Sequence, residues 1–465
     1  MTVSLTLTED QHAALRAHLF PGDGLEAVAF LACGRSAGGD RHRLVVRQIY
    51  PIPHDRCRRT PISVTWNGED IEHLLNAAEV EKLTLVKVHS HPGGFEQFSQ
   101  IDDASDRELL PTINSWVEAD IPHCSVVMLP TGKMFGRYLW RGPSMETLAL
   151  INIVGPDLKF WWADDNSTTP APAFAAAQDQ AFGEGTTNRL RKLRIAVVGA
   201  SGTGSPEIEQ LVRLGAGHLV LVDDDDIEER NLNRITFATA EHAREKTKKV
   251  FAAKADIERK GLGTIVTAID GTIQSPEAIR AVSQCDVIFG CVDSVGGRFT
   301  MNLLASHYLV PYFDVGILLD AEQEGDTRGK IKDILGTVHY LVPGRSSLLT
   351  RDQFTLADVA AEGLHKKDPV AAAQQVEDKY IKGMRVRRPA VISVNMFAAA
   401  LAINDFLARL HPYRKNQNAN IASIEFSLGE LRLTPDEEME NCRVMGRYIG
   451  FGDRSPLLGL PEYGE

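Results

Sequence analysis

A glycine-rich loop between two apolar runs constrains the fold of this chain more than any other feature of its sequence. Residues 193–198 predict a buried strand, the loop GASGTG follows at 199–204, and residues 206–214 have the apolar spacing of a helix. A second apolar run, LVLV at 219–222, leads directly into four consecutive aspartates. A strand, a helix and a second strand in this order make a βαβ unit, which implies a mainly parallel sheet covered by helices.

The same loop predicts a phosphate-binding site. Glycine at Gly199, Gly202 and Gly204 lets the backbone approach phosphate closely, and the amides at the start of the helix then face it. Alone, such a loop more often indicates NAD or FAD. The acidic stretch at 223–226 and the cluster RNLNR at 230–234 favour a nucleoside triphosphate with magnesium, because hydride-transfer enzymes have no use for Asn and Arg there. Without that cluster, the aspartates would indicate only a solvated turn.

A second motif, HSHPGGFEQFSQID at residues 89–102, predicts a metal site in the first part of the chain. His89 and His91 lie two apart at the end of an expected strand, so both side chains point to one face of a sheet. Asp102 follows near the start of an expected helix. Two imidazoles and one carboxylate are a common ligand set for catalytic zinc, which leaves the fourth position to water and lowers the pKa of that water to roughly 7.

Two further side chains complete this candidate site. Glu26 is the candidate base that moves a proton from water to a leaving amine. Ser99 is the candidate hydrogen-bond donor to an oxyanion. Ser99-x-x-Asp102 fits a helix capping box equally well, and the two roles are compatible. A lone His-x-His pair is usually structural, whereas the complete string with Pro, Ser and Asp is far more specific.

The length of 465 residues indicates two or three domains. Residues 163–178 are rich in Asp, Ser, Thr, Pro and Ala, and this composition predicts a linker. We therefore expect a first domain at 1–152, a linker at 153–178 and a second domain at 179–465. Strands are expected at 27–33, 83–88, 125–129 and 287–289, and helices at 69–80, 105–117 and 390–410.

Composition narrows the partners and the compartment. A net charge of −12 argues against nucleic acid as a main partner. No run of eighteen apolar residues predicts a membrane span, and the N-terminal residues do not have the pattern of a signal peptide. Six scattered cysteines form no disulfide framework, which is typical of a reducing compartment. We therefore expect a cytoplasmic protein with no membrane partner.

The string at residues 89–102 resembles, without a gap, the signature of the JAMM (MPN/Mov34) metalloproteases. These include deubiquitinases and bacterial enzymes that trim ubiquitin-like tails. The resemblance covers roughly residues 1–150. The family's glutamate matches Glu26, eight residues before Gly34, and its serine matches Ser99. The resemblance makes the zinc ligands His89, His91 and Asp102.

The phosphate loop, the acidic strand end, the Asn-Leu-Asn-Arg cluster and CVDSVGGR at 291–298 together resemble the ThiF/MoeB superfamily, which contains the ubiquitin-activating enzymes. Its members use ATP to adenylate the C-terminal carboxylate of a ubiquitin-like protein. The carboxylate attacks the α-phosphate while cations and magnesium stabilise charge. The resemblance spans about residues 173–445. It assigns ATP contacts to Gly199, Gly202, Gly204, Asp223, Asp225, Asn231 and Arg234, and the magnesium contact to Asp293.

The two resemblances together imply an α/β protein. An N-terminal α+β domain of the JAMM type, with a cytidine-deaminase-like fold, would be followed by a Rossmann-like, mainly parallel adenylation domain of the ThiF type. The implied cofactors are Zn²⁺ in the first domain and ATP with Mg²⁺ in the second.

Several positions depart from the ThiF/MoeB pattern. Ser201 stands where the loop usually has glycine, and Ala177 where a preceding helix usually has arginine. The catalytic lysine is expected at about Thr247, thirteen residues after Arg234, and we choose Lys248. The neighbouring candidates are Lys246, Lys248 and Lys249.

Many members hold a structural zinc with two Cys-x-x-Cys pairs. The matching places here are Ser347-x-x-Thr350 and Cys442-x-x-Met445, so we expect no structural metal in the second half. Residues 351–441 contain no cysteine for a thioester. Cys442 is then the candidate thioester thiol, unless the enzyme stops at the acyl-adenylate or the thioester forms elsewhere.

These motifs predict a bifunctional enzyme of a bacterial ubiquitin-like pathway, in which one domain trims or removes the modifier and the other adenylates it. Fusion raises the effective concentration of the trimmed product at the second site. The expected partners are a ubiquitin-like protein or its precursor, a conjugating enzyme, and a second copy of the chain bound through the adenylation domain. Two alternatives remain: sulfur-carrier activation for cofactor or siderophore synthesis, and a peptidase joined to a non-catalytic nucleotide-binding scaffold.

Overall fold

The computed structural model describes residues 1–164, 172–321, 330–367 and 391–461. Two compact units divide the chain. The first comprises Met1–Thr168, Ser306–Leu309 and Tyr448–Glu465, and the second comprises Thr169–Ala305 and Val310–Arg447. No helix in the described ranges combines the length and the apolar character needed to cross a bilayer.

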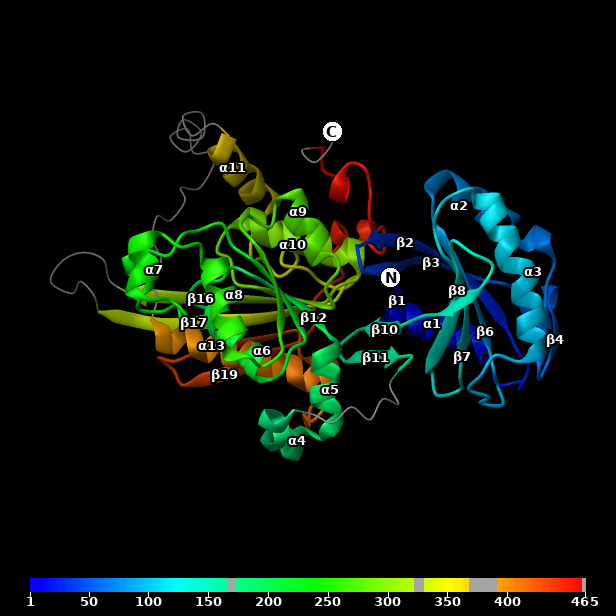
Figure 1. The fold of residues 1–465 in the computed structure, drawn as a ribbon, viewed down its shortest axis with the longest axis horizontal. Helices are drawn as coiled ribbons and strands as arrows, with labels where there is room; N and C mark the ends of the chain where they lie inside the picture. Colours follow the sequence, from blue (N-terminus) through cyan, green and yellow to red (C-terminus); the bar gives the residue numbers. More distant parts are fainter. Residues whose placement is uncertain (165–171, 322–329, 368–390, 462–465) are drawn as a thin grey trace. The chain divides into compact units, whose positions relative to one another are not determined.

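One mixed sheet organises the first unit (Figure 1). Within the described residues its strands lie in the order β11-β10-β1-β3-β2-β6-β7-β8-β9. Their bounds are β1 Thr2–Thr8, β2 Val28–Ala37, β3 Arg41–Pro51, β6 Thr84–Ser90, β7 His123–Met128, β8 Met134–Leu139, β9 Met145–Thr147, β10 Leu150–Val154 and β11 Leu158–Trp162. A separate hairpin joins β4 (Arg58–Thr60) to β5 (Ser63–Thr65).

Helices cover both faces of this sheet. Side chains alternate along β2, so that Phe30 packs with α2 (Glu72–Glu81) and α3 (Gln100–Val117), whereas Leu31 packs with α1 (Glu9–Leu19). Figure 1 shows α2 and α3 side by side along one side of the strands. Because both faces are buried, the central strands are almost continuously apolar, as the sequence predicts for 27–33 and 83–88.

The predicted linker at 153–178 contains regular structure in the described residues. β11 pairs antiparallel with β10 and buries Leu158 and Phe160. The turn Gly155-Pro156-Asp157 between two apolar runs is the sequence signal for this hairpin. Further on, α4 (Ala176–Phe182) is anchored where Gln178 donates to the backbone oxygen of Leu214, at 3.1 Å. Residues 165–171 lie outside the described ranges.

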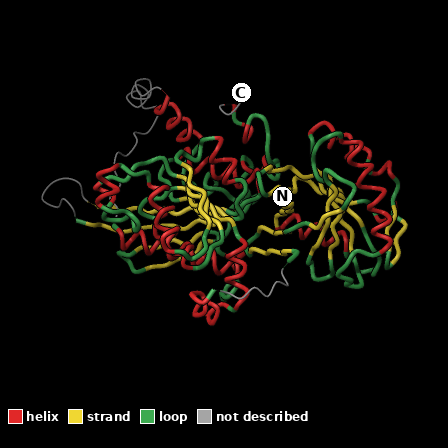
Figure 2. Tube along the Cα trace, viewed as in Figure 1, coloured by secondary structure: helices red, strands yellow, loops and turns green. Residues whose placement is uncertain are grey.

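The second unit has the predicted parallel sheet with an antiparallel extension (Figure 2). Its order in the described residues is β14-β13-β12-β15-β16-β17-β18-β19, and the strands from β14 to β16 run parallel. The bounds are β12 Arg194–Val198, β13 His218–Val222, β14 Ile265–Ile269, β15 Val287–Gly290, β16 Tyr312–Ala321, β17 Ile331–Leu341, β18 Ser423–Ser427 and β19 Arg432–Asp436.

Helices pack on both sides of this sheet, with α6 and α13 on one side and α9 and α10 on the other (Figure 1). The helix bounds are α5 Glu184–Lys192, α6 Gly204–Arg213, α7 Ala240–Glu245, α8 Lys249–Lys260, α9 Pro276–Val282, α10 Val295–Tyr308, α11 Leu356–Lys367 and α13 Ile392–Leu410. β12 lies between β13 and β15. The strands that follow β12 are therefore added first on one side of it, as β13 and β14, and then on its other side, as β15 and β16. This reversal opens a crevice at the carboxyl ends of β12 and β15, where α/β sheets bind ligands.

Candidate functional site

The three predicted metal ligands of the first unit lie together at the end of β6. All three side chains are buried, and their ligand atoms lie within 4.8 Å of one another. His89 Nε2 is 3.2 Å from His91 Nε2 and 2.9 Å from Asp102 Oδ1, and His91 Nε2 is 3.3 Å from Asp102 Oδ2. Ligand atoms bound at roughly 2 Å to one tetrahedral zinc ion are about 3.3 Å apart. The donor set therefore fits a single zinc ion.

The surroundings orient two of these ligands. The Nδ1 of His91 donates to the backbone oxygen of Phe95 at 2.8 Å, which leaves Nε2 as the ring nitrogen with a lone pair for a metal. Asp102 lies in the first turn of α3, where the hydroxyl and the backbone N–H of Ser99 both donate to its Oδ2 at 2.7 Å. The predicted capping box is therefore present. This capping interaction uses the carboxylate of Asp102, which also belongs to the His-His-Asp cluster.

Charge also favours metal binding by Asp102. Burial by itself would raise the pKa of this carboxyl, but hydrogen bonds from His89, His91 and Ser99 hold it well below its usual range. A carboxyl group must be deprotonated to bind a metal ion, and the lowered pKa keeps Asp102 deprotonated.

The strand register brings Glu26 to the same cluster. Val28 pairs with His89 across β2 and β6, and Ala27 exchanges hydrogen bonds with Ser90. Because side chains alternate, Glu26 is expected on the same side as Val28, and it is close enough to His91 and Asp102 to interact with both charges. Its side chain is buried. Burial raises the pKa of Glu26 to about 7, with His91 opposing that rise. A carboxyl that titrates near neutral pH is suited to accept and return a proton.

A buried ionic network, which the sequence motifs did not predict, supports this cluster. Lys87 lies two residues before His89 on β6 and pairs with Asp106 on α3. Arg137 donates to Asp106 Oδ2 through Nε and Nη2, at 2.9 and 2.7 Å. The spacing of these residues in the sequence could have predicted the network. Asp106 lies one helical turn after Asp102, and Lys87 lies two residues before His89, on the same face of the strand. The network holds α3 against β6 and so keeps the three ligands in place.

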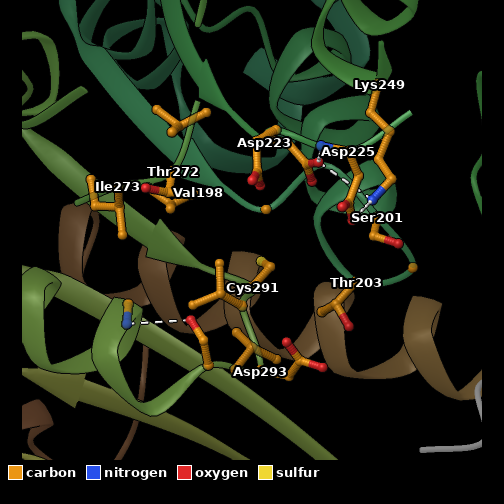
Figure 3. Close-up of a pocket in the computed structure, with 18 of the residues that line it drawn as sticks. Val198, Ser201, Thr203, Asp223, Asp225, Lys249, Thr272, Ile273, Cys291 and Asp293 are labelled. Atoms are coloured by element: carbon orange, nitrogen blue, oxygen red, sulfur yellow. Dashed lines mark hydrogen bonds and ion pairs between the residues drawn. The ribbon is translucent and has the colours of Figure 1, made fainter. Parts of the chain in front are cut away.

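The crevice of the second unit contains a cavity of about 810 Å³ (Figure 3). Seven predicted nucleotide-site residues line it: Gly199, Gly202, Asp223, Asp225, Asn231, Arg234 and Asp293. Asp223 connects the glycine loop to the strand end, because its carboxylate accepts from the backbone N–H of Ala200 at 2.7 Å and of Asp225 at 3.0 Å. The cavity thus brings a glycine loop, carboxylates and cations to one place, as a nucleotide with magnesium requires.

Of the three candidate lysines, all within the described residues, Lys249 lines this cavity and Lys248 does not. Lys249 Nζ lies 2.6 Å from Asp225 Oδ2 and 3.3 Å from Asp223 Oδ1 (Figure 3). Lys248 is the residue before α8, and its Nζ pairs with Asp226 and Asp270 at 3.2 and 3.3 Å. The geometry favours Lys249 over our choice of Lys248, because counting residues from Arg234 could not resolve which way each side chain points at the start of a helix.

A model of the ThiF family matches residues 175–444, more than half of the chain. The chain belongs to the ThiF family. A second model, of prokaryotic homologs of the JAB domain, matches residues 8–141. The predicted fusion of a JAMM-type domain with a ThiF-type domain is confirmed, and so is the α/β fold class with a Rossmann-like second half.

Curated relatives match part of the chain. Ubiquitin-like modifier-activating enzyme 5 of Drosophila erecta is 24% identical over 276 residues, which are 54% of this chain and 65% of that protein. Its Arabidopsis thaliana namesake is 23% identical over 257 residues, 51% of this chain and 57% of that protein. Adenylyltransferase and sulfurtransferase UBA4 of Meyerozyma guilliermondii is 28% identical over 132 residues, 28% of this chain and 30% of that protein. The chain thus spans only part of the length of each relative.

Solved structures also align with the chain. E. coli MccB with ATP aligns with a TM-score of 0.43 and 16% identity, over 61% of this chain and 75% of that chain. SeMet PaaA aligns with a TM-score of 0.38 and 19% identity, over 55% of this chain and 75% of that chain.

Gly204 differs in position from the other ThiF-loop glycines, since it does not line the cavity. A Cβ atom on Gly204 would lie 1.8 Å from the backbone oxygen of Gly199. The absence of a side chain therefore lets α6 begin directly against the loop, so packing by itself requires glycine at position 204.

We expect Gly204→Ala to lower the free energy of unfolding of the second unit by about 3 kcal/mol and to weaken ATP binding, because a backbone oxygen cannot yield to the added methyl group. Urea unfolding followed by far-UV circular dichroism measures the first effect and calorimetry the second. All five tryptophans lie between Trp66 and Trp162 in the first unit, so their fluorescence reports whether that unit is unaffected. Gly185→Ala is the control, because a Cβ atom there meets nothing within 4 Å. An equal loss in both variants would contradict the packing role.

The two places where many ThiF-family members hold zinc adjoin in this structure. The backbone N–H of Cys442 donates to the oxygen of Arg345 at 3.0 Å, and the N–H of Ser347 donates to Thr350 Oγ1 at 2.8 Å. Nearby, the buried guanidinium of Arg351 donates to two backbone oxygens at 2.9 Å. Cys442 is only 3% exposed. Its thiol would have to become accessible before it could accept an acyl group from a protein carrier.

Proposed function

We propose that the chain is a bifunctional enzyme that removes a C-terminal extension or target from a ubiquitin-like protein by zinc-dependent hydrolysis and adenylates the C-terminal carboxylate with ATP. The observation that carries this proposal is that one chain holds both a buried His-His-Asp cluster with Glu26 beside it and a ThiF-type cavity lined by a glycine loop, carboxylates and cations. The names of the relatives, which are modifier-activating enzymes, support the choice of substrate.

In the first domain, His89, His91 and Asp102 would hold the zinc ion. When bound, zinc supplies a water molecule whose pKa is lowered to roughly 7 and polarises the scissile carbonyl. Glu26 would accept a proton from the attacking water and return it to the leaving amine, for which a pKa of about 7 is suitable. Ser99 is the proposed donor to the oxyanion, although in the free protein its hydroxyl donates to Asp102.

In the second domain, the chain's own groups position the reactants and stabilise charge. The amides of the glycine loop and the guanidinium of Arg234 would bind the phosphates, and Asp223 would bind the ribose. Asp293 would hold the magnesium ion. Lys249 is the proposed catalytic lysine. Its Nζ contacts Asp223 and Asp225 in the structure, and the phosphates of ATP would replace these carboxylates as its partners. The substrate carboxylate would attack the α-phosphate, the bond between the α- and β-phosphates would break and pyrophosphate would leave, so the step needs no nucleophile from the protein.

Sulfur-carrier activation is the second candidate. The name of the Meyerozyma relative, an adenylyltransferase and sulfurtransferase, favours it, and so does the burial of Cys442, because a sulfur carrier is activated without a thioester on this thiol. Both candidates require adenylation of a carboxylate. They differ in what reacts with the adenylate. In the modifier pathway the acyl group is transferred towards an amine, and in sulfur-carrier activation a sulfur donor reacts with it.

The test uses the full chain and ubiquitin-fold proteins from the same genome, each made with a short extension after its terminal Gly-Gly. We expect elemental analysis to find about one zinc per chain. The chain should remove the extension, and a chelator should prevent this removal. ATP–pyrophosphate exchange should occur only when the trimmed protein is present. A chain without zinc would overturn the hydrolytic half. ATP binding without exchange, whichever ubiquitin-fold protein is present, would favour the scaffold over the adenylating enzyme.

A further inference from the structure

Asn395, in the first turns of α13, lies at the nucleotide cavity although it is far from every nucleotide-site motif in the sequence. It is one of the residues that line the cavity, and only 7% of it is exposed. Its Nδ2 donates to Thr203 Oγ1 of the glycine loop at 3.0 Å. α13 packs against α6, so the N-terminal end of α13 is held beside the loop.

The loop is shaped to admit this side chain. A Cβ atom on Gly202 would lie 3.0 Å from Asn395 Nδ2 and 3.1 Å from Arg234 Cδ. Any other residue at Gly202 would crowd both side chains. Gly202 therefore leaves room for Asn395 and Arg234 at the same wall of the cavity, in addition to letting phosphate approach.

The Oδ1 atom of Asn395 is a buried acceptor with no hydrogen-bond partner among the described residues. A buried polar atom without a hydrogen-bond partner destabilises the folded protein unless a ligand or a water molecule donates a hydrogen bond to it. Nucleotide phosphates and an ionised carboxylate offer only acceptors, so none of them can satisfy Oδ1. The ribose hydroxyls are donors, but they are assigned to Asp223, whereas Asn395 lies at Thr203 of the glycine loop. The backbone N–H of the residue that carries the reacting carboxylate is a donor, and it must enter the cavity together with that carboxylate.

We infer that Asn395 positions the terminal residue of the acyl substrate: its Oδ1 accepts a hydrogen bond from the backbone N–H of that residue. This inference rests on the proposed adenylation and names a residue that recognises the second substrate rather than ATP. Recognition of a backbone N–H is independent of side chains and suits a C-terminal glycine.

The test compares three stable probes by calorimetry on the full chain: 5′-O-sulfamoyl-adenosine, its glycylglycyl derivative, and the derivative in which the second glycine is N-methylated. The glycylglycyl probe presents the backbone N–H, and the methylated probe lacks it. We expect the wild-type chain to bind the glycylglycyl probe about tenfold more tightly than the methylated one. In Asn395→Ala the two acyl probes should bind equally, when each affinity is expressed relative to the affinity of the same variant for sulfamoyl-adenosine.

Asn404→Ala is the matched control, since Asn404 lies on the same helix, is exposed and only donates to the backbone oxygen of Ala400. If Asn395→Ala retains the preference for the glycylglycyl probe, the inference is overturned while the proposed function stands. If the wild-type chain binds both acyl probes equally, the inference is overturned without any variant. Failure of the wild-type chain to bind sulfamoyl-adenosine at all would overturn the proposed adenylation and the inference together.

Discussion

Replacing Glu26 by glutamine is expected to lower the rate of isopeptide cleavage by a factor of about 10² to 10⁴ and to leave the zinc content unchanged. Glutamine has the shape of glutamate but cannot accept the proton that hydrolysis produces. Glu26 is buried beside His91 without being one of the three clustered ligands, so the metal cluster should survive the change. Cleavage is measured with an extended ubiquitin-fold protein, and zinc by elemental analysis of the same sample.

Two further variants separate the roles of the groups in this site. His89→Ala should lose most of the zinc together with cleavage, because it removes one of three ligands. Glu79→Gln makes the same chemical change at an exposed position of α2 and should cleave normally. Cleavage at the normal rate by Glu26→Gln would remove Glu26 from the mechanism, and loss of zinc in that variant would make it a ligand or a structural residue instead.

Lys249→Met should reduce ATP–pyrophosphate exchange by a factor of about 10² to 10³, whereas Lys248→Met should leave it nearly unchanged. The two residues are neighbours with the same chemistry, so each is the control for the other. Lys249 lines the cavity and is almost fully buried, while Lys248 is about a third exposed and pairs with Asp226 and Asp270. Exchange is measured at saturating concentrations of the trimmed ubiquitin-fold protein.

Removing Lys249 also leaves Asp223 without its cationic partner, so a folded variant must be demonstrated by far-UV circular dichroism. Lys249→Arg keeps the charge and should be folded even if its exchange is slow. The assignment fails if Lys248→Met loses exchange and Lys249→Met does not. Equal losses in the two variants would indicate that the whole acidic turn has moved rather than that one lysine acts on ATP.

Local sequence patterns predicted much of this protein because the relevant residues are close together in the chain. The three proposed metal ligands lie within residues 89–102, where the alternation of side chains along one strand and the start of one helix decide their directions. The glycine loop, the acidic strand end and the Asn-Leu-Asn-Arg cluster lie within about forty residues, which is one βαβ unit. The two folds followed from these motifs and from the apolar runs between them.

The tertiary structure alone decided the features that depend on which groups meet across space. The sequence could not show that Lys249 rather than Lys248 reaches the cavity, because a small difference in backbone direction at a helix start reverses two adjacent side chains. Nor could it show that Gly204 touches the backbone of Gly199, or that Asn395 reaches Thr203 from 192 positions away. Spacing along the chain determines local geometry, whereas close approach between distant segments depends on how sheets and helices pack.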